Sequence, residues 1–483
     1  MKVFMVLAGS LTSFICHTLS AQETESRPNI ILFIGDDIGW DDIGCYGNTV
    51  VLTPNIDRIA REGARFTNVY LTASSCSPSR TSIISGRYPH NTGAAELHTA
   101  LPAEVSIFPE LLRKAGYYTA QAGKWHMGES AKRGFDVVHD NGKKNGEGGE
   151  GMWLDVLRDR PREKPFFLWF ASFDAHRPWG SNDFSGSNNP EQIQPSPYLA
   201  NTRNTKEDLA RYYDEITRFD HYIGQVEQEL ENQGVADNTI VIIMSDNGRP
   251  FPRSKTRVYD SGMKTPFIVK WNKGLSNKGV VSNSLISAID IAPTLMDLSG
   301  VEILPDFQGK SFARLLAQPD IGFRNYIFSE HNWHDYEALE RMVRTKDYLY
   351  VRNLRPNLSN HGPADSNSSA AFQDLKEIRN AGKLTPAQAD IFIIPRPAEE
   401  LYDCTKDPEQ LVNIASLPEY KSILEHMRSA MEQWREETMD TTPGMLTKDW
   451  FDRETGKALE VDKTRGEMPG GKQAVQSRAQ GPF

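Results

Sequence analysis

Hydrophobic residues in this chain gather in short continuous runs that are separated by stretches of helical periodicity. Five such runs, rich in β-branched and aromatic residues, occupy positions 29–35, 117–123, 165–173, 238–245 and 265–271. A strand with one solvent-exposed face alternates polar and apolar residues, whereas a continuous apolar run is typical of a strand that is buried on both faces of a parallel sheet. The runs therefore predict a large, mostly parallel central sheet.

The clearest helical pattern lies between two of these runs, at positions 205–233. Its apolar residues fall three or four positions apart, at Ala210, Tyr213, Ile216, Phe219, Ile223, Val226 and Leu230. Thr205 is a plausible N-cap, and Gly234 follows the last apolar turn as a stop signal. Strands that alternate with helices predict an α/β fold in which helices sandwich a mixed, mostly parallel sheet.

The pattern of hydrophobic and polar residues changes near Phe323. The stretches 324–333, 341–353 and 399–415 look like separate strands with turns, and an amphipathic helix is expected at 419–438. The last twenty residues are rich in Gly and Gln and are expected to be frayed. We therefore expect a catalytic domain at 22–322 and a smaller C-terminal α+β subdomain at 323–483 that ends in a frayed tail.

The N-terminus has the features of a cleaved secretory signal at positions 1–21. Lys2 precedes an apolar run, and small residues lead to a cleavage point after Ala21. A membrane anchor is the alternative, but Ser10 and Thr12 break a run that is already short for a span. No later segment is apolar enough to cross a membrane. The protein is expected to be exported, to the periplasm or the medium, or to a lysosomal-type compartment in a eukaryote.

Charge and cysteine usage narrow the function classes. The net charge of −10 disfavours a general nucleic-acid binder, since there is no basic surplus to neutralise phosphates. A local basic pocket for a small anion remains compatible with it. Removal of the signal leaves Cys45, Cys76 and Cys404, an odd number that suggests a free or specially treated thiol. Their spacing matches no zinc site.

Acidic and amide side chains follow two of the predicted strands. Asp36 and Asp37 come directly after the first strand, and Asp246 and Asn247 follow the strand at 238–245. In open α/β sheets, ligands bind outside the carboxyl ends of the strands. Crowded carboxylates repel one another unless a cation holds them, and oxygen ligands favour a hard ion such as Ca²⁺ or Mg²⁺. Each pair alone could equally be a turn or a helix cap, but the two together favour a metal site.

Basic side chains follow two other predicted strands. Lys124 and His126 come after the run at 117–123, and His176 comes after the run at 165–173. A basic loop then contributes Arg249, Arg253, Lys255, Arg257 and Lys264. A lone histidine is more often structural, and most of the loop charges are expected to be solvated. A metal, lysines and histidines around one point nevertheless indicate a site for an oxyanion with developing charge.

Several segments resemble the signatures of the sulfatase family. They are "CSPSRTSIISGR" at 76–87, "GYYTAQAGKWHMG" at 116–128, "DDIG" at 36–39, "SDNG" at 245–248 and "KTRVYDSGMKTP" at 255–266. The resemblance runs from about residue 27 to the region of residue 413, and the first two segments are long and specific. It implies an alkaline-phosphatase-like fold and an enzyme that hydrolyses sulfuric esters.

The resemblance also implies that Cys76 is oxidised to formylglycine (3-oxoalanine) by a maturation enzyme that reads the Cys-x-Pro-Ser-Arg sequence. The aldehyde hydrate has two hydroxyls on one carbon. One would attack sulfur, and deprotonation of the other would restore the aldehyde and release sulfate. A serine at this position would be left as a stable sulfate ester, and an unmodified Cys76 should be nearly inactive.

The family's functional residues carry over to matching positions of this chain. The resemblance implies that one cation, Ca²⁺, is held by Asp36, Asp37, Asp246, Asn247 and the modified Cys76. It further implies that Lys124 and Lys255 bind sulfate and that Arg80 supports the hydrate. Of the two histidines, His126 would assist the nucleophile and the release step, and His176 would protonate the leaving group. Lys255 is chosen over Lys264 because it stands just ahead of "DSG" at 260–262, although Ser261 replaces a common glycine there.

The substrate is expected to be a sulfated oligosaccharide or polysaccharide, carrying an O-sulfate or an N-sulfate. The context of Cys76 and the late "ELYD" segment are similar to the N-sulfoglucosamine sulfohydrolase branch, and bacterial polysaccharide sulfatases share the same outline. Candidate sugar contacts are Glu96, His98, His331, His334 and Arg341, each of which could instead be an ordinary surface or core residue. Two alternatives stay open: a phosphoester or phosphonate ester hydrolase on the same fold, and a catalytically silent glycan-binding relative.

Overall fold

A large eight-stranded sheet forms the centre of the molecule. The computed structural model describes residues 27–359 and 361–483, so the predicted signal at 1–21 lies outside the described residues. The strand order is β5 (Val137–His139), β4 (Tyr118–Gly123), β6 (Phe166–Ala171), β1 (Asn29–Gly35), β7 (Thr239–Ser245), β8 (Phe267–Lys270), β2 (Ala64–Phe66) and β9 (Val280–Ser282). The neighbours β4, β6, β1 and β7 are all parallel, while β8 is antiparallel to β7. The predicted mixed, mostly parallel sheet is confirmed.

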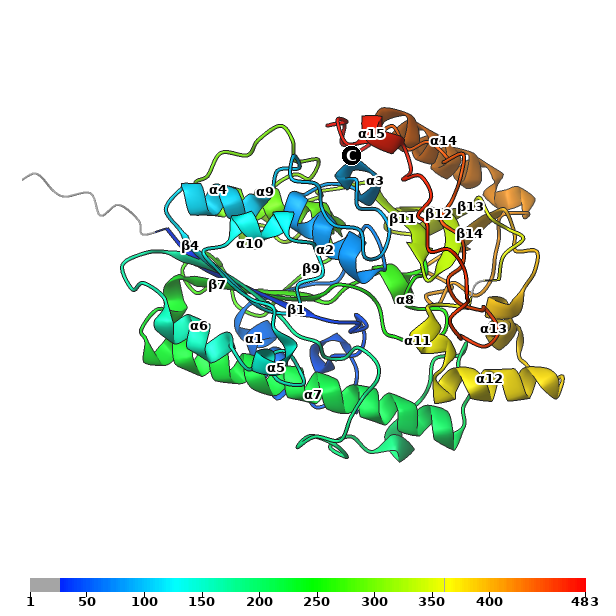
Figure 1. Cartoon of the computed structure of the whole chain (residues 1–483), viewed down its shortest axis with the longest axis horizontal. Coiled ribbons are helices and arrows are strands. Elements are labelled where there is room, and N and C mark those ends of the chain that lie inside the picture. The colour runs from blue at the N-terminus through cyan, green and yellow to red at the C-terminus, as the bar shows by residue number, and fades with distance from the viewer. Residues whose placement is uncertain (1–26, 360) are drawn as a thin grey trace, which may run out of the picture.

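Helices cover both faces of this sheet (Figure 1). One face carries α1 (Pro54–Glu62), α6 (Trp153–Asp159) and α7 (Arg203–Asn232), and the other carries α2 (Cys76–Ser85), α4 (Phe108–Lys114) and α9 (Ile291–Leu298). Strand β1 shows why its sequence is continuously apolar. Ile31 and Phe33 pack in the core of one face, whereas Ile30 and Leu32 pack in the core of the other.

The long helix α7 begins two residues before the predicted start. Thr202, rather than Thr205, is the N-cap, and its hydroxyl oxygen accepts a hydrogen bond from the backbone N–H of Thr205 at 3.2 Å. Thr205 is instead buried inside the first turn, where its hydroxyl donates to Asp374 at 2.9 Å. The predicted cap was wrong because both threonines fit the sequence pattern. Both hydroxyls donate to Asp374, and the extended backbone of Thr202 (φ −115°, ψ 166°) is what places the start of the helix there.

A smaller antiparallel sheet follows the large one. It consists of β11 (Ile327–His334), β12 (Tyr336–Arg344), β13 (Tyr348–Asn353) and β14 (Glu399–Asp403). Helix α14 (Lys421–Glu437) packs on it through Trp434, which stacks on Phe328 with ring centroids 5.1 Å apart. The predicted α+β character of the C-terminal part is confirmed, and the boundary at residue 323 stays a prediction.

The C-terminal segment is held against the large α/β part. Arg87 donates to the backbone carbonyls of Val475 and Ser477, both at 2.7 Å, and the Asn91 amide donates to the carbonyl of Ala474 at 2.7 Å. The expectation of a frayed tail was therefore wrong. Its Gly and Gln content says little about order, because buried side chains of the α/β part hydrogen-bond its backbone.

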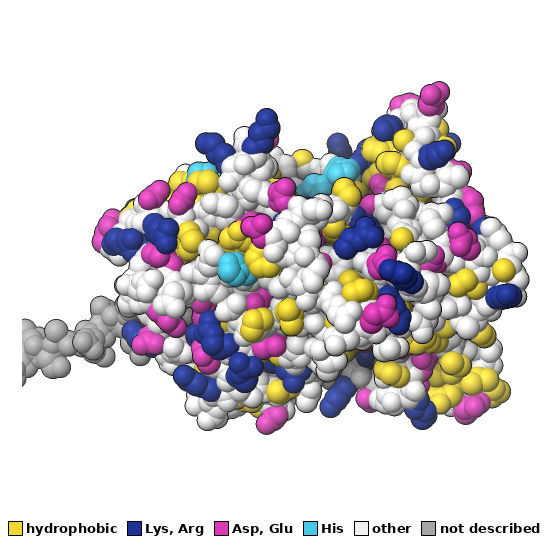
Figure 2. Space-filling model, turned by 90° about the horizontal axis from the view of Figure 1, so that it is seen from below, with side chains coloured by type: hydrophobic (Ala, Val, Ile, Leu, Met, Phe, Trp, Pro, Cys, Tyr) yellow, Lys and Arg dark blue, Asp and Glu magenta, His cyan; other side chains and the backbone are white. Residues whose placement is uncertain are grey.

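The surface is mixed in charge. Figure 2 shows lysine and arginine side chains interspersed with aspartate and glutamate over the described part of this face. This fits a chain with 54 basic and 64 acidic residues. Within residues 27–359 and 361–483, none of the helices has the length and apolarity that crossing a membrane would require.

Candidate active site

The four central parallel strands all end at one place. Asp36 and Asp37 follow β1, and Asp246 follows β7, which pairs with β1 in register. On the other side of β1, strand β6 leads to His176 and strand β4 leads to Lys124. The structure brings these side chains together because neighbouring parallel strands present their carboxyl ends at the same edge.

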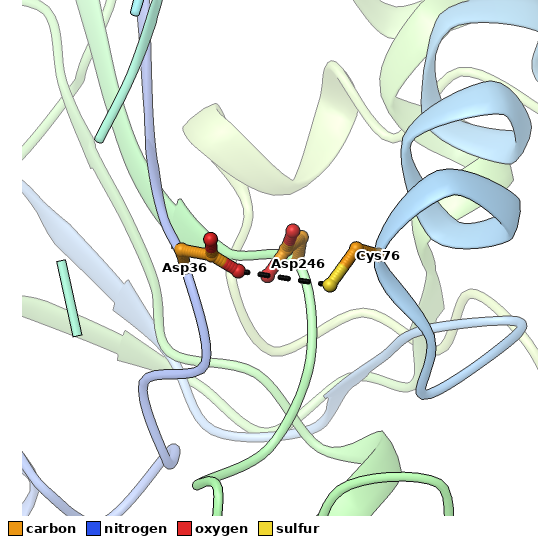
Figure 3. Close-up of side chains that lie close together, drawn as sticks. All are labelled: Asp36, Cys76 and Asp246. Carbon is orange, nitrogen blue, oxygen red and sulfur yellow. Dashed lines mark hydrogen bonds between the residues drawn. The ribbon is translucent and has the colours of Figure 1, made fainter. Parts of the chain in front are cut away.

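Cys76 faces two of the carboxylates (Figure 3). It is the first residue of α2 and is buried, and its sulfur lies 3.8 Å from Asp36 Oδ1. One ligand atom each from Asp36, Cys76 and Asp246 lie within 4.8 Å of one another. Burial raises the pKa of the Cys76 thiol to about 12; the neighbouring carboxylates also raise it, and Lys124 and Lys255 lower it. The side chain is thus a protonated thiol as it stands.

Asn247 and Asp37 complete an oxygen-rich cluster. The Asn247 amide nitrogen donates to Asp246 Oδ1 at 2.8 Å and to an oxygen of Asp37, while its buried Oδ1 has no hydrogen-bond partner among the residues that the structure describes. Burial raises the pKa of Asp37 to about 6, with a further contribution from Asp36. An unpartnered amide oxygen beside three crowded carboxylates is a donor set that fits a hard divalent cation.

Three buried or half-buried cations surround the cluster. Lys255 Nζ lies 2.6 Å from Asp37 Oδ2, Lys124 forms an ion pair with Asp36, and Arg80 Nε donates to Asp246 Oδ2 at 2.7 Å. Burial opposes ionisation of Asp36, but Lys124 and the other cations hold its pKa well below the ordinary value. Each carboxylate is therefore matched by one cation before any ligand binds, and the same cations could meet an incoming oxyanion.

Two histidines lie at the edge of the cluster. His176 Nε2 is 4.0 Å from Asp37 Oδ2, and its Nδ1 contacts the carbonyl oxygen of Arg177. His126 Nε2 lies 2.6 Å from Nδ1 of His98. Burial, and then Lys124, lower the pKa of His126 to about 2, so its ring is neutral.

The backbone is strained at this cluster. Asp37 has φ 65° and His126 has φ 61°, values in the left-handed region that residues with a Cβ rarely adopt. Such conformations cost of order 1–3 kcal/mol each and persist where the surrounding structure holds a side chain in a required place. The strain falls on one cluster carboxylate and on one histidine beside it.

A cleft of about 810 Å³ opens over one side of the cluster. Its lining includes Lys124, the imidazole rings of His98, His126 and His176, and the cation Arg177. The lining also includes the acidic residues Glu147, Asp174 and Glu215, together with Arg218. The cleft has room for a ligand larger than a sulfate ion, next to the groups that could bind one.

Asp365 belongs to the cluster, although sequence reasoning did not find it. It lies on the short helix α11 (Ala364–Asn367), and its Oδ2 is 3.6 Å from both Lys255 Nζ and His176 Nε2. Its sequence context, "GPADSNSS", reads as an ordinary polar loop. The only signal was one acidic residue in that loop, and only the fold shows that the loop reaches the large sheet.

Four of the candidate sugar contacts are buried. Glu96 accepts from Thr447 at 2.7 Å and pairs with Arg465, and Arg341 makes two 2.7 Å bonds to Asp440. His334 Nδ1 contacts Ser75 Oγ at 2.8 Å, just ahead of Cys76.

The fourth, His331, is buried and lines a second pocket, distinct from the cleft, together with Arg257, His334 and Arg453. The structure therefore places Glu96, His331, His334 and Arg341 outside the lining of the cleft, where only His98 of the five lies.

Comparison with known protein families agrees with this arrangement. The family model described as "Sulfatase" matches residues 28–145 and 152–301, and the model "N-sulphoglucosamine sulphohydrolase, C-terminal" matches residues 253–356. The two matches together include every residue of the cluster except Asp365.

Individual relatives cover most of the chain. An ulvan-active sulfatase of Formosa agariphila is 30% identical over 462 residues, covering 84% of this chain and 74% of the relative. Human N-sulphoglucosamine sulphohydrolase is 30% identical over 460 residues, covering 86% and 91%.

Solved structures share the fold. A protein in complex with its substrate D-glucosamine-2-N,6-O-disulfate superposes with a TM-score of 0.67 at 21% identity, covering 85% of this chain and 98% of the other. A phosphonate monoester hydrolase of Agrobacterium radiobacter superposes with a TM-score of 0.64 at 17% identity, covering 83% and 94%. At these identities the likeness establishes the architecture alone.

Proposed function

The chain belongs to the sulfatase family of sulfuric ester hydrolases, and we propose that it removes sulfate from a sulfated carbohydrate with a formylglycine formed from Cys76. The observation that carries this proposal is the position of Cys76 at the start of α2, facing Asp36 and Asp246. The oxidised side chain would lie where the cation, the two lysines and the helix N-terminus meet.

In the metal-free protein, the raised pKa of the Cys76 thiol argues against direct attack by sulfur. With a pKa of about 12 the thiolate is scarce near neutral pH, and the thiol itself is a poor nucleophile. A formylglycine hydrate would supply one hydroxyl that attacks sulfur and a second whose deprotonation releases sulfate. Neither hydroxyl depends on the thiol's ionisation.

Ca²⁺ is the cation that we propose for the cluster. Asp36, Asp37, Asp246 and Asn247 would hold it through oxygen atoms, and the unpartnered Oδ1 of Asn247 would gain its missing partner. The ion would supply Lewis-acid stabilisation and orient the nucleophile. A larger, flexible oxygen shell favours Ca²⁺ over Mg²⁺, which demands a near-ideal octahedron.

The remaining side chains have separate tasks in this proposal. Lys124 and Lys255 would bind sulfate oxygens, and the Arg80–Asp246 pair would hold the metal ligand in place. His176 would donate a proton to the leaving oxygen or nitrogen, since its Nδ1 contacts the Arg177 carbonyl and leaves Nε2 to face the cluster. His126 would accept the proton whose loss releases sulfate.

The substrate class rests on the relatives and on the cleft. One relative is named for ulvan and another for N-sulphoglucosamine, both sulfated sugars. The open cleft of about 810 Å³ suits a sugar residue attached to further residues. We further propose that the chain is exported, on the basis of the signal-like residues at 1–21.

Peptide mass spectrometry across Cys76, on protein from its native host, tests the proposal. Conversion of the CH₂–SH group to an aldehyde lowers the peptide mass by ~18 Da and abolishes thiol alkylation. Hydrolysis of sulfated and phosphorylated forms of the same sugars would then separate a sulfatase from a phosphoester or phosphonate hydrolase. An active protein with an unmodified Cys76 thiol would contradict the mechanism, and a converted but inactive protein would favour a glycan-binding role.

A further inference from the structure

The two imidazole rings of His98 and His126 form a direct pair in the lining of the cleft. His98 Nδ1 lies 2.6 Å from His126 Nε2, and the ring centroids are 4.7 Å apart. His126 is half-buried beside Lys124, whereas His98 is exposed. The pair therefore reaches from the edge of the cluster to solvent.

The structure holds His98 in place from several sides. Its backbone N–H donates to the Ser77 hydroxyl oxygen at 2.8 Å, one residue beyond Cys76 on α2. The preceding residue, Leu97, donates to the Trp333 carbonyl at 3.2 Å and accepts from Arg465. His98 itself has φ 63°, the same left-handed conformation as His126.

The two loops that carry the histidines are also tied to each other. Leu101 N–H donates to the Met127 carbonyl at 3.1 Å. A Cβ added at Gly128 would come within 2.4 Å of Ala100 Cβ, so the loops pack too closely there for any other residue. The contact between the rings is thus the product of a built scaffold and does not depend on two flexible side chains meeting by chance.

Partial burial and nearby charges lower the pKa of both rings below the ordinary value. Burial lowers the pKa of His98, and Arg465 and Lys124 lower it further. Burial is also the largest cause that lowers the pKa of His126. Lys124, His98 and Arg80 lower this pKa further, and Asp36 raises it. A neutral imidazole has one N–H and one lone pair, so the short contact needs a donor on one ring and an acceptor on the other.

We propose that His98 is a positioning residue that accepts the Nε2–H of His126, and thereby leaves His126 with a lone pair on Nδ1. The opposite assignment would put the His126 proton on Nδ1, and this nitrogen could not then take a proton from the site. We place the lone pair on Nδ1, the nitrogen not shared with His98, because Lys124 and Arg80 lower the pKa of His126 and nearby cations favour a lone pair over an N–H.

The pair also offers a path for the proton to leave. When Nδ1 of His126 accepts a proton, its Nε2 proton can move to Nδ1 of His98, and His98 can release its own Nε2 proton to water. One proton enters at His126 and one leaves at His98, so neither ring keeps a charge, and both rings are left in the opposite tautomer. The starting tautomers return when His98 takes a proton from water on Nε2, its Nδ1 proton moves back to Nε2 of His126, and His126 releases its Nδ1 proton to water in the cleft. The use of this path in turnover rests on the proposed function, because it needs His126 as the base for sulfate release.

Nitrogen-15 NMR of the full-length protein with labelled histidine tests the assignment. The chain has 11 histidines, and His126→Gln and His98→Gln variants assign the two rings. We expect a protonated Nε2 and an unprotonated Nδ1 on His126, and an unprotonated Nδ1 on His98. A protonated Nδ1 on His126 overturns the proposal. This readout does not require formylglycine, so it stands or falls separately from the proposed function.

Two variants of His98 extend the test to a change in tautomer and rate. His98→Phe removes the acceptor, and we expect a mixture of His126 tautomers and a kcat lower by roughly 10–100-fold, with KM little changed. His98→Gln keeps an acceptor oxygen and should recover part of the rate. His426→Phe, outside the cleft, is the matched control. A His98→Phe protein with wild-type thermal melting and an unchanged His126 spectrum overturns the proposal.

Discussion

Lys255 Nζ lies 2.6 Å from Asp37 Oδ2, and both side chains are completely buried. The lysine comes from the loop after β7 and the aspartate from the end of β1, so the ion pair joins the two strands that supply the carboxylates. A buried ion pair is stabilising only when its hydrogen-bonding needs are met. Asp365 contributes a second carboxylate 3.6 Å from the same ammonium, which places Lys255 between the cluster and the C-terminal part.

Alanine replacements should distinguish the role of Lys255 from that of Lys264, the other lysine of the same loop. We expect Lys255→Ala to lower kcat/KM by about 10²–10³-fold, the usual cost of removing a donor to developing anionic charge. Lys264 instead lies over the Trp40 ring, 3.9 Å from its centroid. Lys264→Ala should therefore cost stability of about 1 kcal/mol and leave kcat/KM nearly unchanged. Equal losses of activity in the two variants would contradict the choice of Lys255.

The pKa of Asp37 predicts how cation binding depends on pH. Burial raises this pKa from 3.8 to about 6 in the metal-free protein, and a cation needs the ionised carboxylate. Calcium affinity should therefore fall as pH falls below about 6, by about tenfold per pH unit if one proton is displaced. Isothermal titration calorimetry between pH 5 and 8 measures this.

In the metal-free protein, the raised pKa of Asp37 makes the folded state less stable as pH rises. Because native Asp37 holds its proton more tightly than the unfolded chain does, the free energy of unfolding should decrease as pH rises from about 4 to about 6. Added Ca²⁺ should restore the loss above pH 6. In an Asp37→Asn variant, both pH dependences should be weaker; if they match the wild type, another group is responsible.

Asp365 should affect catalysis although it follows no strand of the large sheet. Asp365→Asn removes the negative charge shared by Lys255 and His176, and we expect kcat to fall by roughly 10–100-fold because both side chains lose an orienting partner. Asp374→Asn is the matched control, since Asp374 accepts from Thr205 and Asn204 at the start of α7. It should lower the melting temperature and spare kcat. Wild-type kcat in Asp365→Asn would remove this residue from the site.

The sequence predicted the parts of the site that a strand end or a signature segment carries. Asp36, Lys124, His176 and Asp246 each follow a buried apolar strand, and parallel pairing then requires them to meet. Asp365 has no such constraint, because the chain returns to the site from the second sheet.

The sequence also failed to predict the roles of charged side chains whose ion-pair partners lie far along the chain. Glu96 and Arg341 are polar residues in promising segments, but Arg465 and Asp440, far along the chain, take up their charges inside the protein. The order of the tail was missed for the same reason. Its own residues are unremarkable, and Arg87 supplies the hydrogen bonds that hold it.

The attachment of the tail can be measured through Arg87. This side chain is buried and donates to four backbone carbonyls: Asn91 at 3.0 Å, Asp306 at 2.9 Å, and Val475 and Ser477 at 2.7 Å each. Arg87→Ala leaves these acceptors without their donor, so we expect the free energy of unfolding to fall by about 3 kcal/mol or more. Limited proteolysis should then cut within 464–483 first. Arg478→Ala, which removes an exposed ion pair to Asp306, is the control and should cost less than about 1 kcal/mol. An intact tail and an unchanged melting temperature in Arg87→Ala would show that other contacts hold this segment.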